Sequence, residues 1–239
     1  MPLAIVTGAS RGLGFAVARS LADRGWALVL DARGASDLEA VERELGELTE
    51  VTAIAGDVSD PDHRRDLVAA AGEKIDLVVN NASALGPSPQ PALAQYPLEE
   101  LERVYRVNVF APLALVQLAL PRLVDGARIL NITSDAAVEP YEGWGGYGSS
   151  KAALEQLSAI LGAEHPELKV YAVDPGDMRT RMHQEAFPGE DISDRPPPEE
   201  SVPGLLALID DGPPSGRYRA REVTWPNARA VSWTQGAEV

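Results

Sequence analysis

The sequence predicts a single α/β domain built on a doubly wound parallel sheet of the Rossmann type. Short apolar runs alternate with segments of helical periodicity along most of the 239 residues, and neither an internal repeat nor a linker interrupts them. A glycine-rich segment directly follows the first apolar run, where sheets of this type bind nucleotides. The chain is long enough to bury a large core, so we expect one domain over residues 1–239.

The first third of the chain contains three strand–helix units followed by a fourth strand. Apolar runs predict strands at residues 3–7, 27–30, 51–55 and 75–80. Between them, apolar residues at helical spacing predict helices over residues 13–21, 38–45 and 60–71. Ser36 and Asp60 are the expected N-caps of the second and third helices, and Pro61 suits the first helical position.

The rest of the chain continues the alternation and then changes character. A long apolar helix is predicted over residues 97–123 with a kink at Pro112, followed by a strand at 128–133, a helix at 147–162 and a strand at 168–173. Residues 177–198 form a long polar segment, which we expect to be a substrate loop because such segments in compact domains are usually functional. A helix over residues 199–209, an edge strand at 216–220 and an irregular tail at 221–239 complete the prediction.

The composition excludes several classes of protein. The formal net charge is −15, which argues against nucleic acid and anionic membranes as partners, because both bind basic surfaces. Cysteine is absent, which excludes disulfides and thiol nucleophiles, and the three histidines have no metal-ligand spacing. We therefore expect no bound metal. No basic leader precedes the first strand, and we expect a cytoplasmic protein for that reason.

The glycine-rich segment T-G-A-S-R-G-L-G, residues 7–14, predicts a site for a dinucleotide. Its three glycines allow a sharp turn and a close approach of the backbone to a pyrophosphate. The N-terminus of the helix that follows supplies free N–H groups and the positive end of its dipole. The expected cofactor contacts in this loop are Gly8, Ser10, Arg11, Gly12, Leu13 and Gly14.

The spacing of Ser134, Tyr147 and Lys151 predicts an acid/base device. Hydride transfer to a carbonyl leaves an alkoxide that must be protonated, but an ordinary tyrosine has a pKa of about 10, too high for efficient exchange near neutral pH. Lys151 lies one helical turn from Tyr147, and its positive charge favours the phenolate. Ser134 is expected to donate a hydrogen bond to the substrate oxygen.

Together these motifs resemble the short-chain dehydrogenase/reductase family over roughly residues 1–180. Further motifs agree: N-N-A at residues 80–82, followed by Ser83 where the family has glycine, and P-G-x-x-x-T at residues 175–180. The resemblance implies that Asn108 stabilises a helix bulge and a water leading to Lys151. It also implies cofactor contacts from Asp57, Val58, Asn80, Asn81, Ala82, Tyr147, Lys151, Pro175, Gly176 and Thr180.

The end of the second strand, L-D-A-R at residues 30–33, bears on the choice between NADP(H) and NAD(H). In NAD-preferring members of the family an acidic residue here binds both ribose hydroxyls, but this chain has Ala32 at that position. Arg33 and Arg11 stand where NADP-preferring relatives hold the 2′-phosphate, so the sequence favours NADP(H). A register shift of one residue would make Asp31 the ribose ligand and favour NAD(H), and this alternative stays open.

The residues expected to face the substrate are apolar or aromatic, which favours an uncharged carbonyl or alcohol of moderate size. By family analogy they are Leu85, Val138, Tyr141, Trp144, Met178, Met182 and Phe187. The segment S-G-R-Y-R-A at residues 215–220 departs from the common family ending, which packs into tetramers. This atypical segment puts the usual tetramer in question and leaves a homodimer, through the helices that carry Asn108 and Tyr147, as the assembly to test.

Functions from two different classes, an enzyme and a regulatory protein, fit these motifs. The leading one is an NAD(P)(H)-dependent oxidoreductase that interconverts a carbonyl and an alcohol, with NADPH-dependent reduction favoured. The alternatives are an NADP(H)-binding regulatory protein of the same fold that senses redox state, and an NAD-preferring dehydrogenase. The presence of Ser134, Tyr147 and Lys151 favours an enzyme, because loss of any of them would have favoured the regulator.

Overall fold

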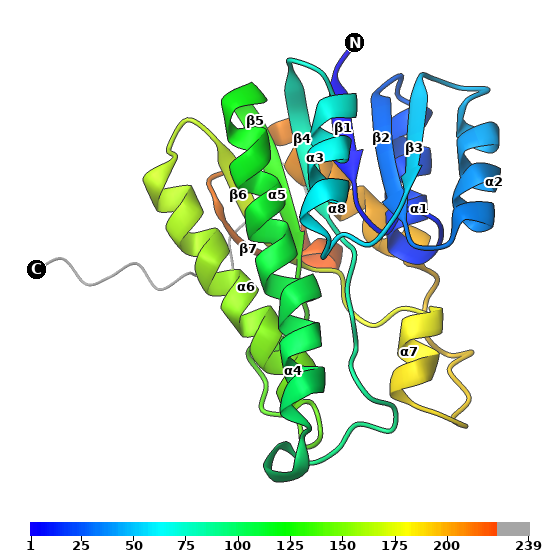
Figure 1. Ribbon diagram of the computed structural model, residues 1–239, viewed down its shortest axis with the longest axis vertical. Coiled ribbons are helices and arrows are strands. Elements are labelled where there is room, and N and C mark those ends of the chain that lie inside the picture. Colours follow the sequence, from blue (N-terminus) through cyan, green and yellow to red (C-terminus); the bar gives the residue numbers. More distant parts are fainter. Residues whose placement is uncertain (224–239) are drawn as a thin grey trace, which may run out of the picture.

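The computed structural model describes residues 1–223 of the 239, which form one seven-stranded sheet with helices on both faces (Figure 1). The strands lie in the order β3-β2-β1-β4-β5-β6-β7, and neighbouring strands are parallel throughout. The predicted Rossmann-type fold is therefore confirmed. The strands are β1 (Leu3–Val6), β2 (Ala27–Ala32), β3 (Val51–Ala55), β4 (Ile75–Asn80), β5 (Leu123–Ile132), β6 (Lys169–Asp174) and β7 (Gly216–Arg219).

The helices bury both faces of the sheet. One face carries α1, α2 and α8, which bury Leu21, Leu38 and Leu205 against the strands. The other carries α3, α5 and α6, and Leu67 and Leu115 are fully buried there. Burial from both sides explains why the strands are continuous apolar runs. The helices are α1 (Gly12–Ala22), α2 (Ala35–Leu45), α3 (Pro61–Ala70), α4 (Leu98–Tyr105), α5 (Ala111–Ala119), α6 (Gly145–Glu164), α7 (Arg181–Ala186) and α8 (Val202–Asp211).

The two predicted N-caps have different outcomes. Asp60 caps α3, because its side chain accepts a hydrogen bond from the N–H of Asp62, and Pro61 opens the helix. The prediction of Ser36 as the cap of α2 is wrong. β2 continues to Ala32 and the helix already begins after Gly34, which leaves Ser36 inside the first turn.

The predicted long helix after residue 97 is present, but its irregular turn precedes Pro112. α4 and α5 are joined without a break by a π-helical turn, Arg106–Phe110, and Pro112 follows that turn as the second residue of α5. By length and hydropathy, Leu98–Arg122 would also suit a membrane-spanning helix, but 44% of its apolar window is buried inside the protein. Leu115 and Val116 pack against the strands.

The segments after β6 also differ in part from the prediction. The polar segment 177–198 contains the short helix α7, which lies beyond the carboxyl ends of the strands (Figure 1). The predicted edge strand is present as β7, which pairs in parallel with β6. Of the predicted irregular tail, residues 224–239 lie outside the described part of the chain, and Ala220–Glu222 forms a 3₁₀ turn.

Candidate active site

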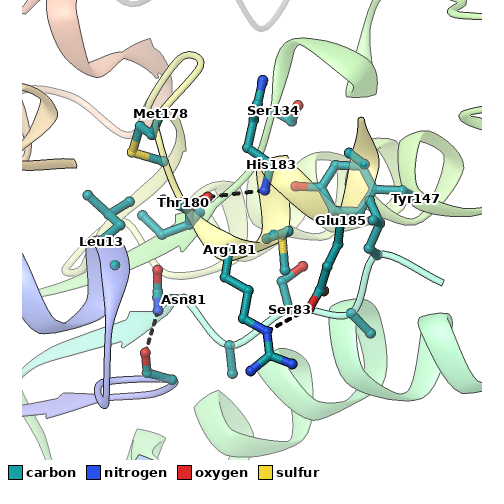
Figure 2. A pocket seen from close by; sticks show the side chains of 18 of the residues that line it. Leu13, Asn81, Ser83, Ser134, Tyr147, Met178, Thr180, Arg181, His183 and Glu185 are labelled. Carbon is teal, nitrogen blue, oxygen red and sulfur yellow. Dashed lines mark hydrogen bonds and ion pairs between the residues drawn. The ribbon is translucent and has the colours of Figure 1, made fainter. Parts of the chain in front are cut away.

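A cavity of about 1250 Å³ lies at the carboxyl ends of the strands. Its walls come from the segments after β1 to β6 and from α7. The strand order reverses between β1 and β4, and this is where doubly wound sheets usually bind ligands. Figure 2 shows Leu13 and Asn81 on one side of the cavity and Ser134 and Tyr147 on the other.

The glycine loop packs so closely on the end of β4 that two of its glycines leave no room for a side chain. A Cβ on Gly8, whose φ is +66°, would lie 2.9 Å from the Cα of Ala82, and one on Gly14 would lie 2.3 Å from the carbonyl oxygen of Gly8. Asn81 Nδ2 donates to the carbonyl oxygens of Thr7 and Gly8, at 2.9 and 3.1 Å. The loop is therefore fixed to the strand next to it.

The other side of the loop is open to a ligand. A Cβ on Gly12 would contact only Thr180, whose Cγ2 would be 3.7 Å away. α1 begins at Gly12, and the N-cap residue Arg11 makes no side-chain capping bond, which leaves the first N–H groups of the helix available. A backbone cradle at a helix N-terminus is the donor set that a dinucleotide pyrophosphate requires, so these residues fit the predicted cofactor.

The carboxylate of Asp31 is only 1% exposed, and both of its oxygens are engaged within the protein. Oδ1 accepts a hydrogen bond from the N–H of Gly8 at 2.7 Å, and Oδ2 lies 3.1 Å from His63 Nε2. The His63 ring fills the space beside Gly56, where an added Cβ would lie 2.3 Å from its Nδ1. Asp31 thus supports the glycine loop, although it borders the cavity.

Two exposed arginines border the cavity near the end of β2. Arg11 comes from the glycine loop, where its Nη1 lies 4.0 Å from Asp37 Oδ2, and Arg33 directly follows the strand. Burial raises the pKa of the neighbouring Asp57, but hydrogen bonds from Ser59 and the charge of Arg33 more than offset this and lower it. This end of the cavity therefore combines cations with an ionised carboxylate.

Tyr147 and Lys151 lie one turn apart on α6 and are 9% and 2% exposed. Lys151 Nζ lies 5.5 Å from the centroid of the tyrosine ring and donates to the carbonyl oxygen of Ile132 at 2.7 Å. Ser134 follows β5, and its Oγ donates to Asp135 Oδ1 at 2.8 Å. The three residues predicted to carry the chemistry therefore line one cavity.

Burial controls the protonation of this pair. It raises the pKa of Tyr147, the carboxylate of Asp174 raises it further, and hydrogen bonds with Ser83 and Ser134 lower it. Burial also lowers the pKa of Lys151 to about 7. The protein alone therefore holds Tyr147 as a neutral phenol, which is the form that donates a proton.

Asn108 lies in the π-helical turn and is fully buried. Its Oδ1 accepts hydrogen bonds from Ala84 N at 2.7 Å and Ser83 Oγ at 3.1 Å, and its Nδ2 donates to Ala84 O and Ser150 Oγ, both at 2.9 Å. Asn108 thus joins the loop after β4 to α6 at a helix bulge. The hydroxyl of Ser83, at the family's glycine position, adds a contact with Tyr147 that the sequence did not indicate.

Aromatic rings form the wall of the cavity next to Tyr147. The ring centroid of Trp144 lies 5.8 Å from those of Tyr147 and Phe187, and Phe187 lies 4.9 Å from His183. Phe187 and His183 belong to the segment predicted as a substrate loop. The residues predicted to face the substrate line the cavity, except Val138, which lies outside it and is 51% exposed.

The predicted cofactor contacts divide into two groups. Asn80 and Gly14 lie behind the cavity wall: Asn80 Nδ2 donates to Asn131 Oδ1 at 2.8 Å within the sheet, and Gly14 packs on Gly8. The others line the cavity: Gly8, Ser10, Arg11, Gly12, Leu13, Arg33, Asp57, Val58, Asn81, Ala82, Tyr147, Lys151, Pro175, Gly176 and Thr180.

No sequence motif indicated two further polar side chains near the site. The side chain of His183 is 11% exposed, and its Nε2 has no hydrogen-bond partner within residues 1–223. Arg217, on β7, is 4% exposed and donates a hydrogen bond to the carbonyl oxygen of Ser134. Only the packing of α7 and β7 brings these two residues to the site.

A cradle for a dinucleotide beside a buried proton donor is what a nicotinamide-dependent oxidoreductase requires. Comparison with known proteins agrees with this class, because residues 2–191 match the family model for short chain dehydrogenases. The chain belongs to this family. It is accordingly an NAD(P)-dependent oxidoreductase that acts on CH–OH or carbonyl groups.

Similar proteins cover most of the chain. A benzil reductase ((S)-benzoin forming) of Saccharomyces cerevisiae is 33% identical over 193 residues, which cover 76% of this chain and 73% of the yeast enzyme. A short chain dehydrogenase structure from Pseudomonas syringae is 31% identical with a TM-score of 0.86, over 92% of this chain and 94% of that one. An Escherichia coli CFT073 structure in complex with NADPH is 27% identical with a TM-score of 0.81, over 92% and 96% of the two chains.

Proposed function

We propose that the protein reduces an uncharged, moderately apolar carbonyl compound with NADPH, and that Tyr147 donates the proton. The observation that carries this proposal is the burial of Tyr147 as a neutral phenol between the glycine-loop cradle and an aromatic wall. Carbonyl reduction consumes one proton at the substrate oxygen, and a neutral phenol inside the cavity supplies it.

Four polar residues of the site have a role in this reaction. The cofactor, when bound, supplies the hydride. Ser134 and Tyr147 hold the carbonyl oxygen by hydrogen bonds, and Tyr147 passes its proton to that oxygen as the alcohol forms. Lys151 holds the nicotinamide ribose and stabilises the phenolate that remains. Asn108 keeps the loop after β4 and the catalytic helix at a fixed separation through its four hydrogen bonds.

The end of β2 supports NADP(H) rather than NAD(H). Ala32 offers no carboxylate to the ribose, and both oxygens of Asp31 are already bound by Gly8 and His63. Arg11 and Arg33 leave exposed guanidinium groups at the same end of the cavity, where a 2′-phosphate could accept charge-assisted bonds. The NADPH complex of a protein with this fold supports the same choice.

Replacing Arg33 by alanine should weaken NADPH binding about tenfold and leave NADH binding nearly unchanged. The reason is that the lost cation contacts only the phosphorylated ribose. Titration of cofactor fluorescence measures both dissociation constants, and added salt should narrow the wild-type preference because exposed charge pairs are screened.

Two further variants complete this test. Arg43→Ala removes an exposed arginine on α2 and should change neither dissociation constant. Asp31→Asn should weaken both cofactors alike, because Asp31 supports the glycine loop. Selective loss of NADH affinity in Asp31→Asn would instead mean that Asp31 binds the ribose and that the enzyme prefers NAD(H).

The charge arrangement around the cavity supports an uncharged substrate. Three of the arginines that line the cavity contact glutamates: Arg103 with Glu100, Arg106 with Glu102 and Arg181 with Glu185. The wall next to Tyr147 is apolar and aromatic.

The direct test is NADPH consumption with a panel of aldehydes, ketones and quinones. Acetophenone should be reduced with a higher kcat/KM than the same ketone carrying a carboxylate. If NADPH binds tightly but no carbonyl compound in the panel is reduced, the redox-sensing function becomes the better account of the site.

We also propose a homodimer in the cytoplasm, formed through α4, α5 and α6. Phe110, at the end of the π-helical turn between α4 and α5, is 56% exposed, and Ile160 on α6 is 43% exposed. α4 and α6 lie side by side (Figure 1). Phe110→Glu should convert the dimer to a monomer in sedimentation velocity, because a buried interface does not accept an unpaired charge. The control Leu48→Glu introduces the same charge after α2 and should leave the dimer intact, whereas a monomeric wild type would refute the proposal.

A further inference from the structure

A buried arginine joins three elements directly behind the catalytic residues. Arg217, on the edge strand β7, is 4% exposed. Its Nε donates to Glu155 Oε1 at 2.9 Å, and its Nη2 lies 3.6 Å from Asp174 Oδ2. The same Nη2 donates to the backbone carbonyl oxygen of Ser134 at 3.3 Å. The guanidinium therefore links α6, the end of β6 and the segment after β5.

Both carboxylates that Arg217 contacts are tied to the catalytic segments. Glu155 lies on the catalytic helix α6 and also accepts a hydrogen bond from Thr133 Oγ1 at 2.7 Å. Asp174 ends β6 and accepts one from the N–H of Gly176 at 2.9 Å. Their side chains are 12% and 7% exposed. Carboxylates buried this deeply require a compensating charge, and Arg217 serves both of them.

We propose that Arg217 is a positioning residue of this active site, which holds the carbonyl of Ser134 and balances the charges of Glu155 and Asp174 so that Tyr147 can lose and regain its proton. The inference rests on the proposed role of Tyr147 as the proton donor. Arg217 acts from behind the cavity wall, through its neighbours. It belongs to the segment 215–220, which we predicted from the sequence to be an atypical ending for the family.

The electrostatic argument depends on the groups around Tyr147. They are Asp135 after β5, Asp174 on β6, Arg217 on β7, Lys151 and Glu155 on α6, and His183 on α7. After burial, Asp174 is the next cause that raises the pKa of Tyr147. Burial also raises the pKa of Asp174 itself, whereas the hydrogen bond from the N–H of Gly176 and the charge of Arg217 lower it. At the alkaline pH where a tyrosine titrates, Asp174 is ionised, and without Arg217 its negative charge would act on the phenolate without compensation.

The test measures the ionisation of Tyr147 without any substrate. The ultraviolet absorbance of the phenolate is followed against pH in the complex with NADP⁺, as the difference between each protein and the same protein carrying Tyr147→Phe. Arg217→Met should raise the apparent pKa of Tyr147 by about one unit. Arg217→Lys keeps the positive charge and should restore most of the wild-type value.

A second variant tests the same charge balance from the other side. Asp174→Asn should lower the apparent pKa of Tyr147, and combining it with Arg217→Met should return the value towards that of the wild type. Asp174→Asn keeps the hydrogen bond between Arg217 and Glu155. This variant can therefore be measured even if Arg217→Met does not fold. The control Arg43→Met removes an exposed arginine on α2 and should leave the titration nearly unchanged.

An unchanged phenolate titration in both Arg217→Met and Asp174→Asn would overturn the inference and make Arg217 a structural ion-pair partner only. This result is distinct from failure of the proposed function. The proposed function fails if turnover survives Tyr147→Phe, which is a measurement of catalysis. The titrations report only the ionisation of the phenol.

Discussion

Tyr147→Phe should lower kcat for NADPH-dependent ketone reduction by about 10²–10⁴-fold, with little change in the dissociation constant of NADPH. The substitution removes the proton donor and one hydrogen bond to the substrate oxygen. It keeps the ring that packs on Trp144, so the shape of the cavity is retained. Single-turnover measurements with acetophenone would separate the chemical step from product release.

Tyr141→Phe is the matched control for this prediction. Tyr141 also borders the cavity, but it is 48% exposed and its hydroxyl donates to Asp135 Oδ2 at 2.9 Å rather than contacting the catalytic residues. Losing this hydroxyl should change kcat by less than about tenfold. Near-normal turnover in Tyr147→Phe would rule out the proposed proton donor, whichever result the control gives.

Lys151→Met should abolish most of the activity and weaken cofactor binding, yet make the protein more stable near neutral pH. The activity falls because the phenolate and the nicotinamide ribose lose their cation. The stability rises because Lys151 is 2% exposed and burial penalises its charged form. A methionine fills similar space without a charge to desolvate.

The gain in stability should depend on pH in a defined direction. Burial lowers the pKa of Lys151 to about 7, below its ordinary value of 10.5. Between these two values the unfolded chain keeps a proton that the native protein gives up, so the wild type becomes more stable as the pH rises. Each pKa unit corresponds to roughly 1.4 kcal/mol, so the advantage of Lys151→Met is a few kcal/mol at or below neutral pH and disappears towards pH 10.

Thermal unfolding at several pH values measures this effect. A few kcal/mol corresponds to a rise in Tm of roughly 5–10 °C for a chain of this size. Lys74→Met changes an exposed lysine and should leave Tm unchanged across the same range. A Lys151→Met protein less stable than the wild type at pH 6 would mean that the hydrogen bond to Ile132 outweighs the penalty of burial.

The parts of the site that depend on local sequence could be predicted. The glycine loop requires glycines because a Cβ at position 8 or 14 has no space, and this requirement appears directly as a motif. The tyrosine–lysine pair depends on a single helical turn of α6, so its spacing alone indicates that the two residues share a face. The alternation of strands and helices is likewise a local pattern.

The parts that depend on distant contacts could not be predicted. The sequence left open whether Asp31, at the end of β2, binds the cofactor ribose. Its contacts with Gly8 and His63 could not be predicted, because the contact with His63 requires α3 to pack beside β2. Arg217 lies in the predicted edge strand without a motif to mark it, and only the packing of α6 beside β7 brings it to Glu155. The π-helical turn at Asn108 was indicated only by the family resemblance, because Pro112 is the stronger local signal for a break.

The contact between Asp31, His63 and Gly56 makes these three positions mutually dependent during evolution. Any larger residue at position 56 collides with the imidazole ring, and loss of the imidazole leaves a buried carboxylate without its partner. A side chain at position 56 should therefore be accommodated only together with a smaller residue at position 63. Natural drift or laboratory selection for a different nucleotide is then directed to positions 32 and 33, where a new side chain faces the ligand without disturbing this contact.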